Sequence, residues 1–253
     1  MSALTSVNAS APSTLLQRSP LFWQIGLGSK SSWRLWGLAA FLVSVPVFVQ
    51  APLVRAWPWL SLLLTLVWIG LGIQLYRRET TQRVGDLLLG FSGSWLAGSL
   101  YWGWFRWEPL MHLPLEAIGL PLAVWAIWRA RRSANNAYLI GALFYLGSLW
   151  GTAITDLYFY VVGLIPYWRE IMQVSPDASA PILREALLHM QTPWGILWVG
   201  ILASVLCVSG LIPFVRLSVF RGRSPSLHWW TFSGAVVSSL LVDGLFWLAA
   251  RLS

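Results

Sequence analysis

The sequence predicts an all-α polytopic integral membrane protein, a bundle of about seven transmembrane helices. Three observations support this fold class. The chain is 57% hydrophobic and only 10% charged, whereas charged residues make up about 25% of an average soluble domain. Apolar stretches of about 20 residues, the length that crosses a bilayer, recur along it. Twelve of its 17 lysines and arginines gather in four clusters between these stretches, as expected of loops on the cytoplasmic side.

The basic clusters also predict the orientation of the chain. Two membrane-length stretches separate each cluster from the next, and one stretch follows the fourth cluster. The N-terminus is therefore expected in the cytoplasm and the C-terminus on the outer or lumenal side. The clusters are Arg18/Lys30/Arg34, Arg77/Arg78/Arg83, Arg129/Arg131/Arg132 and Arg216/Arg221/Arg223.

The expected elements follow in chain order. Residues 1–32 are rich in Ser, Thr, Ala and Pro and lack the features of a signal peptide, so they predict a disordered or surface-lying tail. Residues 33–253 form a single transmembrane domain. Its spans are expected near 35–54, 57–76, 84–105, 110–128, 138–163, 194–215 and 228–249.

The third span is expected to be the central helix. Gly90, Ser94 and Gly98 recur at steps of four, and a stripe of small residues lets two helices approach closely. Asp86 lies near the cytoplasmic start of the same span, and this position predicts a role at a helix end.

The segment 166–192 is the only long outer loop. Apolar residues recur within it at steps of three and four, which is typical of a short amphipathic helix. Such a helix would either cover the outer end of the bundle like a lid or rest on lipid.

Ionisable residues within spans are costly, so they are candidates for a functional site. With the predicted topology, four separate stretches deliver polar groups to one outer layer of the membrane. Glu116 lies ~9 Å below the outer surface, and Asp243 lies ~22 Å along a helix that starts inside. The candidate polar site comprises Arg106, Glu108, His112, Glu116, Asp156 and Asp243.

Three roles are open for Glu116. Spacing by four would put Glu108, His112 and Glu116 on one helical face, which suits a proton relay, a ligand site or a metal site. Alternatively Pro114 begins a helix, and Glu116 is stabilised in its first turn by the helix dipole. Glu116 and Asp243 are expected to approach each other or a common cavity.

Arg106 is expected to pair with a carboxylate. It is one of five basic residues assigned to the outer side, and a poorly solvated guanidinium needs a partner. The candidates are Glu108, Glu116, Asp156 and Asp243.

Several functions are excluded. The chain has no GxxxxGK[ST], GxGxxG or HExxH motif. Lys30 is the only lysine and lies outside every predicted span, so no retinal Schiff base is possible. Cys207 is the only cysteine, which excludes intrachain disulfides and cysteine-rich clusters. No metal site is predicted. The net charge of +8 is placed in cytoplasmic loops that face anionic lipid, so nucleic acid is not an expected partner.

Three segments carry a resemblance to a known family. They are residues 90–119, residues 155–169, and Gln191-Thr192-Pro193-Trp194-Gly195. Together they resemble a multi-pass membrane protein family of cyanobacteria that is catalogued only as a domain of unknown function. The resemblance covers residues 30–250. It implies a thylakoid or plasma membrane location in a cyanobacterium, and no activity.

Another similarity is looser. Pro114-Leu115-Glu116 resembles the Pro-x-Glu-Glu of membrane-bound lycopene cyclases, which use acidic side chains on a polyene. Ala117 stands in place of the second acid.

Three functions remain open, and the sequence indicates no cofactor. The first is a non-catalytic factor that binds a lipid, a pigment or a membrane-protein complex, in an assembly or auxiliary role. The second is a proton-coupled carrier of a small solute, for which Glu116 and Asp243 are the candidate groups. The third is a membrane-embedded enzyme acting on an isoprenoid or pigment.

Overall fold

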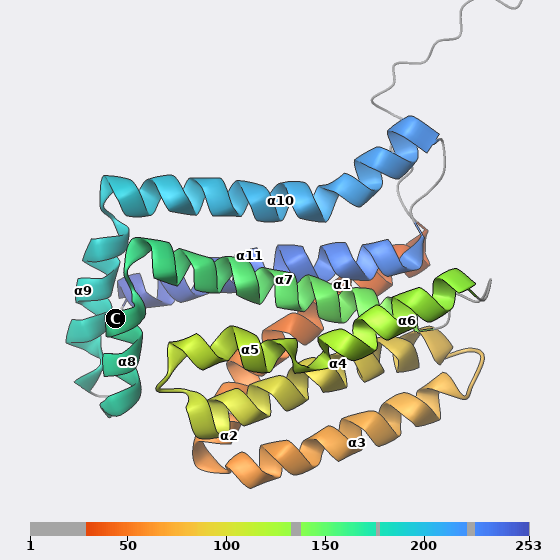
Figure 1. Cartoon of the computed structure of the whole chain (residues 1–253), viewed down its shortest axis with the longest axis horizontal. Helices are drawn as coiled ribbons and strands as arrows, with labels where there is room; N and C mark the ends of the chain where they lie inside the picture. The colour runs from red at the N-terminus through yellow and green to blue at the C-terminus, as the bar shows by residue number, and fades with distance from the viewer. Residues whose placement is uncertain (1–28, 133–137, 176–177, 222–225, 253) are drawn as a thin grey trace, which may run out of the picture.

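The computed structural model describes residues 29–132, 138–175, 178–221 and 226–252, and within these ranges it contains helices and turns but no strand (Figure 1). The all-α class is therefore confirmed. Residues 1–28 of the predicted tail lie outside the described residues, and Lys30 already belongs to the first helix.

The described residues form eleven α-helices and four short 3₁₀- or π-helical elements, η2 to η5. In chain order the elements are α1 (Lys30–Val45), η2 (Pro46–Gln50), α2 (Ala51–Ala56), α3 (Pro58–Tyr76), α4 (Gln82–Leu100), η3 (Tyr101–Phe105), η4 (Pro109–Met111), α5 (His112–Glu116), η5 (Ala117–Gly119), α6 (Leu120–Arg132), α7 (Leu139–Val162), α8 (Ile165–Gln173), α9 (Ala180–Met190), α10 (Pro193–Arg221) and α11 (Leu227–Leu252).

Each of the seven predicted segments coincides with a helix or a run of helical elements. The first segment is α1, η2 and α2 in series, and the third is α4 continued by the π-helical turn η3. The fourth is the least regular, because the short elements η4, α5 and η5 precede α6. Prolines at the start of η4 and inside α5 remove backbone donors, which favours short helical pieces over one continuous helix.

The two ends of the bundle differ in composition. The turn from α3 to α4, which carries Arg77 and Arg78, lies at the same end as the basic last turn of α6 and the start of α7 (Figure 1). The short helices α8 and α9 lie across the opposite end (Figure 1). Two of the basic clusters therefore lie at one end of the bundle, as expected if both face the same side of a membrane.

Four described helical segments are long and apolar enough to cross a membrane: Lys30–Ala56, Pro58–Tyr76, Pro109–Arg132 and Pro193–Phe214. A fifth is added if α7 and α8, which are separated by a bend of 103°, count as one span. The helices α4 and α11 are long enough but are not among them. Both are rich in Ser and Gly, and much of their surface is covered by other helices rather than open to lipid.

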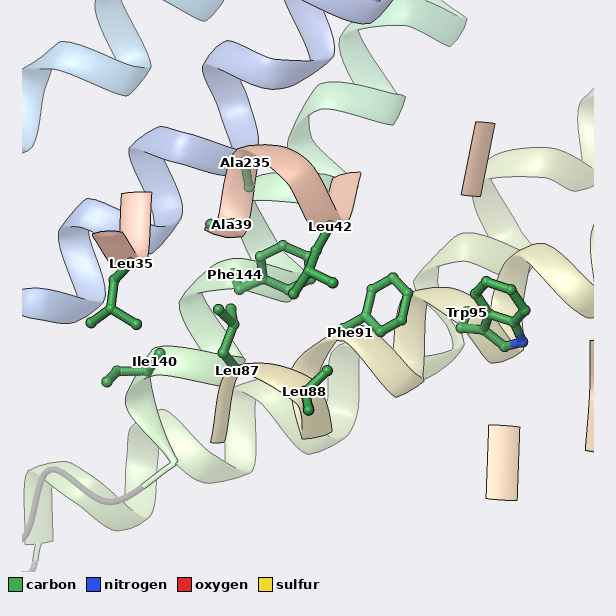
Figure 2. Packing of buried hydrophobic residues seen from close by; sticks show 10 residues of the cluster. All are labelled: Leu35, Ala39, Leu42, Leu87, Leu88, Phe91, Trp95, Ile140, Phe144 and Ala235. Atoms are coloured by element: carbon green, nitrogen blue, oxygen red, sulfur yellow. The ribbon is translucent and has the colours of Figure 1, made fainter. Parts of the chain in front are cut away.

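The core lies between α1, α4, α7 and α11 (Figure 2). Phe91 and Phe144 meet there with ring centroids 6.5 Å apart, and Trp95 continues the cluster along α4. The predicted close approach of the third span is confirmed at Gly90, where an added Cβ would overlap the backbone of Gly141 on α7.

A buried amide joins the first three helical segments. Gln50, at the end of the π-helical turn η2, is fully buried. Its Nε2 donates to the carbonyl of Trp95 at 2.6 Å and to Ser99 Oγ at 2.8 Å. The hydroxyl of Ser61 on α3 lies 2.8 Å from that of Ser99. The π-helical turn between α1 and α2 thus positions a side chain that bonds across to α4.

Candidate functional site

A histidine–aspartate pair lies near the α8–α9 end of the bundle. Nδ1 of His112 on α5 lies 2.8 Å from Oδ1 and 3.1 Å from Oδ2 of Asp156 on α7. The side chain of Asp156 is 4% exposed and that of His112 is 13% exposed. An ionised carboxylate only accepts hydrogen bonds, so Nδ1–H is the donor to it; Nε2 is then an acceptor in the neutral imidazole and a donor in the imidazolium.

Three aromatic side chains enclose this imidazole. The ring centroid of His112 lies 4.4 Å from that of Tyr101, 5.9 Å from Trp102 and 5.4 Å from Trp168. The rings of Trp102 and Trp168 are close to parallel, at 12°. Nε2 of His112 has no hydrogen-bond partner among the residues that the structure describes. The pair therefore presents one ring nitrogen without a described hydrogen-bond partner within an aromatic wall.

Local backbone features bring these residues together. The π-helical turn η3 widens the end of α4 and carries Tyr101 and Trp102. At the end of α7, Gly163 takes a left-handed conformation with φ of +80°, which favours glycine. The chain then turns by 103° into α8, and this turn brings Trp168 onto the imidazole.

The helix before the site begins with a side-chain cap. Oε1 of Glu108 accepts a hydrogen bond from the N–H of Leu110 at 3.3 Å, at the start of η4. His112 then begins α5, which ends at Glu116. The expectation that Pro114 begins a helix with Glu116 in its first turn is therefore wrong. Pro114 lies in the first turn itself, where its missing N–H removes no helical hydrogen bond.

The expected carboxylate partner of Arg106 is not observed. Glu108 instead accepts from Arg169 Nη2 at 2.8 Å, and the guanidinium of Arg106 makes no ion pair within the described ranges. Arg106 contributes through its backbone, since its carbonyl accepts from Tyr101 Oη at 3.3 Å and from Trp168 Nε1 at 3.2 Å. The sequence could not predict this choice, because α8 follows the sharp bend and its direction is not encoded in hydropathy.

The Glu108–Arg169 pair lies at the rim of the site. The hydrogen bond from Arg169 is the main reason that the pKa of the Glu108 carboxyl is below its ordinary value. Both side chains are well exposed, at 38% and 42%. Pairs of this kind contribute little stability but can fix the position of a helix such as α8.

Glu116 lies within electrostatic range of both His112 and Asp156. Its backbone carbonyl accepts a hydrogen bond from the hydroxyl of Tyr145 on α7. Its carboxylate has no hydrogen-bond partner in the described part of the chain. Of the described acids in the predicted spans, Glu116 is therefore the one whose carboxylate lacks a hydrogen-bond partner.

Asp243 lies on α11 and pairs with α7. Its Oδ2 accepts from Thr155 Oγ1 at 2.8 Å, and Asp156, the residue after Thr155, lies within electrostatic range. Glu116 and Asp243 share Asp156 as a neighbour, but no interaction joins them to each other in the described structure. Five of the six candidate residues thus fall into three groups: His112, Asp156 and Glu116 together, Asp243 with Thr155, and Glu108 with Arg169. The side chain of Arg106 joins none of them within the described ranges.

Several contributors were missed or assigned differently from sequence. Trp102 and Trp168 fit a band of aromatic residues at span ends, and Tyr101 has no spacing signal at all. Asp86 does serve at a helix end, but at that of another helix: Oδ2 accepts from the N–H of Ile140 at 2.9 Å and so caps the start of α7. Within the described residues no group of three or more His, Cys, Asp or Glu could hold a metal ion.

Comparison with known proteins adds a family but no activity. No curated protein and no solved structure matches the chain. The model of one protein family matches residues 39–251, which is most of the chain and includes every residue of the candidate site. The resemblance seen in the sequence is confirmed to that extent: the chain belongs to the family described as Protein of unknown function (DUF3120).

Proposed function

We propose that this chain is a seven-span integral membrane protein, with the α8–α9 end outside, that binds a lipid or pigment without catalysis in an auxiliary or assembly role. The observation that carries the proposal is the free Nε2 of His112 within its aromatic wall. The basic helix ends at the opposite end of the bundle support the orientation.

The chemistry of the imidazole defines the ligand. With Nδ1–H donated to Asp156, the lone pair on Nε2 accepts a hydrogen bond from a hydroxyl group or binds a metal centre carried by the ligand. Tyr101, Trp102 and Trp168 offer ring surfaces to an apolar or conjugated body. Amphipathic lipids and pigments combine both features, and the bilayer supplies them.

The pairing of the acids favours binding over catalysis. Asp86 is held by the start of α7, Asp156 by His112 and Asp243 by Thr155. Carboxylates that already accept hydrogen bonds from the protein are poor proton donors to a substrate. They act instead as structural partners that fix the helices around the imidazole.

The test is co-purification from native membranes in a mild detergent, followed by absorption spectra and mass analysis of bound molecules. We expect one lipid or pigment at near-stoichiometric amount with the wild type, and its loss in His112→Ala. The matched control is Gln74→Ala, an exposed position near the end of α3 that does not contribute to the site, which should retain the ligand. A wild-type protein without ligand, or equal retention by both variants, contradicts the proposal.

A second candidate is a proton-coupled carrier, which the open carboxylate of Glu116 favours. Glu116 beside His112 and Asp156 is an arrangement through which a proton could be exchanged. In proteoliposomes a carrier would move protons or solute under an imposed pH gradient, and Glu116→Gln would abolish that flux. A binding factor would show no flux and would keep its ligand in Glu116→Gln.

A further inference from the structure

A groove lies at the end of the bundle opposite His112. It is bounded by the last turns of α6 and the first turns of α7 and α11, and its volume is about 560 Å³. Leu143, Leu146 and Phe232 form apolar walls, and Arg131 and His228 line it as well. This volume falls within the range of sites for small molecules, about 300–1,000 Å³.

Among the described residues that line the groove, Arg131 brings a positive charge and no carboxylate of an Asp or Glu balances it. Three arginines occupy the last turn of α6, and two of them lie over tryptophan rings: Arg129 is 5.5 Å from Trp125 and Arg132 is 3.9 Å from Trp128. Arg131 is exposed and has no ion pair or ring contact within the described ranges. It is the arginine of this turn that faces the groove.

We infer that this groove binds an anionic phospholipid, with its phosphate on Arg131 and an acyl chain along the leucine and phenylalanine wall. A guanidinium offers a planar fork of donors that matches phosphate oxygens. Basic pockets between membrane helices on the cytoplasmic side suit the anionic lipids of that leaflet. The apolar wall explains why the occupant is a lipid rather than a free anion. This site is separate from the one proposed at His112 and takes a different ligand.

Two variants test the guanidinium of Arg131 and the volume of the groove independently. Arg131→Gln removes the guanidinium and keeps the groove. Ala130→Phe fills the groove, which Ala130 lines, and keeps every charge. The matched control is Arg78→Gln, which removes an exposed cation at the same end of the bundle from a residue that does not line the groove.

The measurement is native mass spectrometry of the full chain released from nanodiscs that contain equal amounts of phosphatidylglycerol and phosphatidylcholine with the same acyl chains. The wild type should retain one phosphatidylglycerol in preference. Arg131→Gln should lose about fivefold in that preference, the value of one cation near an anionic surface. Ala130→Phe should lose bound lipid of both kinds, and Arg78→Gln should match the wild type.

Two results would overturn the inference. One is equal retention of the two lipids by the wild type. The other is an equal loss of preference in Arg131→Gln and Arg78→Gln, which would indicate diffuse charge at this end of the bundle. Thermal midpoints measured in parallel identify a variant that fails to fold, and Arg131→Gln tests the inference without Ala130→Phe.

Discussion

At the scale of single residues, the most connected polar side chain is an uncharged amide rather than one of the acids. Nε2 of Gln50 cannot exchange places with Oε1, because the Trp95 carbonyl that it contacts at 2.6 Å is itself only an acceptor. The orientation of the amide is therefore set by α4. No pattern in the sequence points to Gln50, since it carries no charge and belongs to no motif.

Replacing Gln50 by leucine should lower stability. The change removes the donor from the Trp95 carbonyl and from Ser99, and a hydrogen bond between membrane helices is worth about 0.6 kcal/mol on average and up to about 1.7. We expect a loss of about 1–2 kcal/mol, measured as a lower thermal midpoint in detergent. Gln74→Leu, an exposed position on α3, is the control and should stay within about 0.5 kcal/mol.

At the scale of elements, α4 is predictable and its neighbours at the site are not. The small-residue stripe identifies α4 as the helix that others approach, and Gly90 against Gly141 confirms it. Hydropathy gives the positions of the long helices because lipid selects apolar surfaces. The short elements around His112 depend on a π-helical turn, a 3₁₀ turn and a left-handed glycine. Those choices depend on tertiary contacts, so the aromatic wall could not be assembled from the sequence.

A pair of Gly→Ala variants tests the close approach of α4 and α7. Gly90→Ala should destabilise the protein by at least about 1–3 kcal/mol, because the added methyl group overlaps backbone and the helices must separate. Gly70→Ala, on α3, meets no atom within 4 Å and should be neutral or stabilising by up to about 1 kcal/mol. The comparison is made by thermal unfolding in detergent. Equal midpoints would show that the two helices are not in contact at Gly90.

At the scale of the whole molecule, the basic helix ends and the α8–α9 end define two faces of the proposed membrane topology. The two faces lie at opposite ends of the bundle (Figure 1). The sequence places seven membrane-length segments, while four or five described helices meet a strict apolarity requirement. The difference arises because α4 and the first half of α11 are largely covered by other helices and need little apolar surface of their own.

Single-cysteine labelling measures this topology. In a Cys207→Ser background, Glu185→Cys on the exposed face of α9 and Arg78→Cys in the α3–α4 turn should react with a membrane-impermeant reagent from opposite sides. We expect Arg78→Cys to react only when the cytoplasmic face is accessible. Labelling of both positions from the same side would require α8 and α9 to lie at the other surface.

The packing of α1 against α11 sets an order on the assembly of this protein during synthesis. Trp36 Nε1 donates to Ser233 Oγ at 3.4 Å, and Ser238 Oγ donates to the carbonyl of Ala40 at 2.6 Å, across almost 200 residues of chain. The ribosome must therefore deliver α11 to the membrane before α1 finds its partner. Until then the face of α1 that packs against α11 remains without its partner.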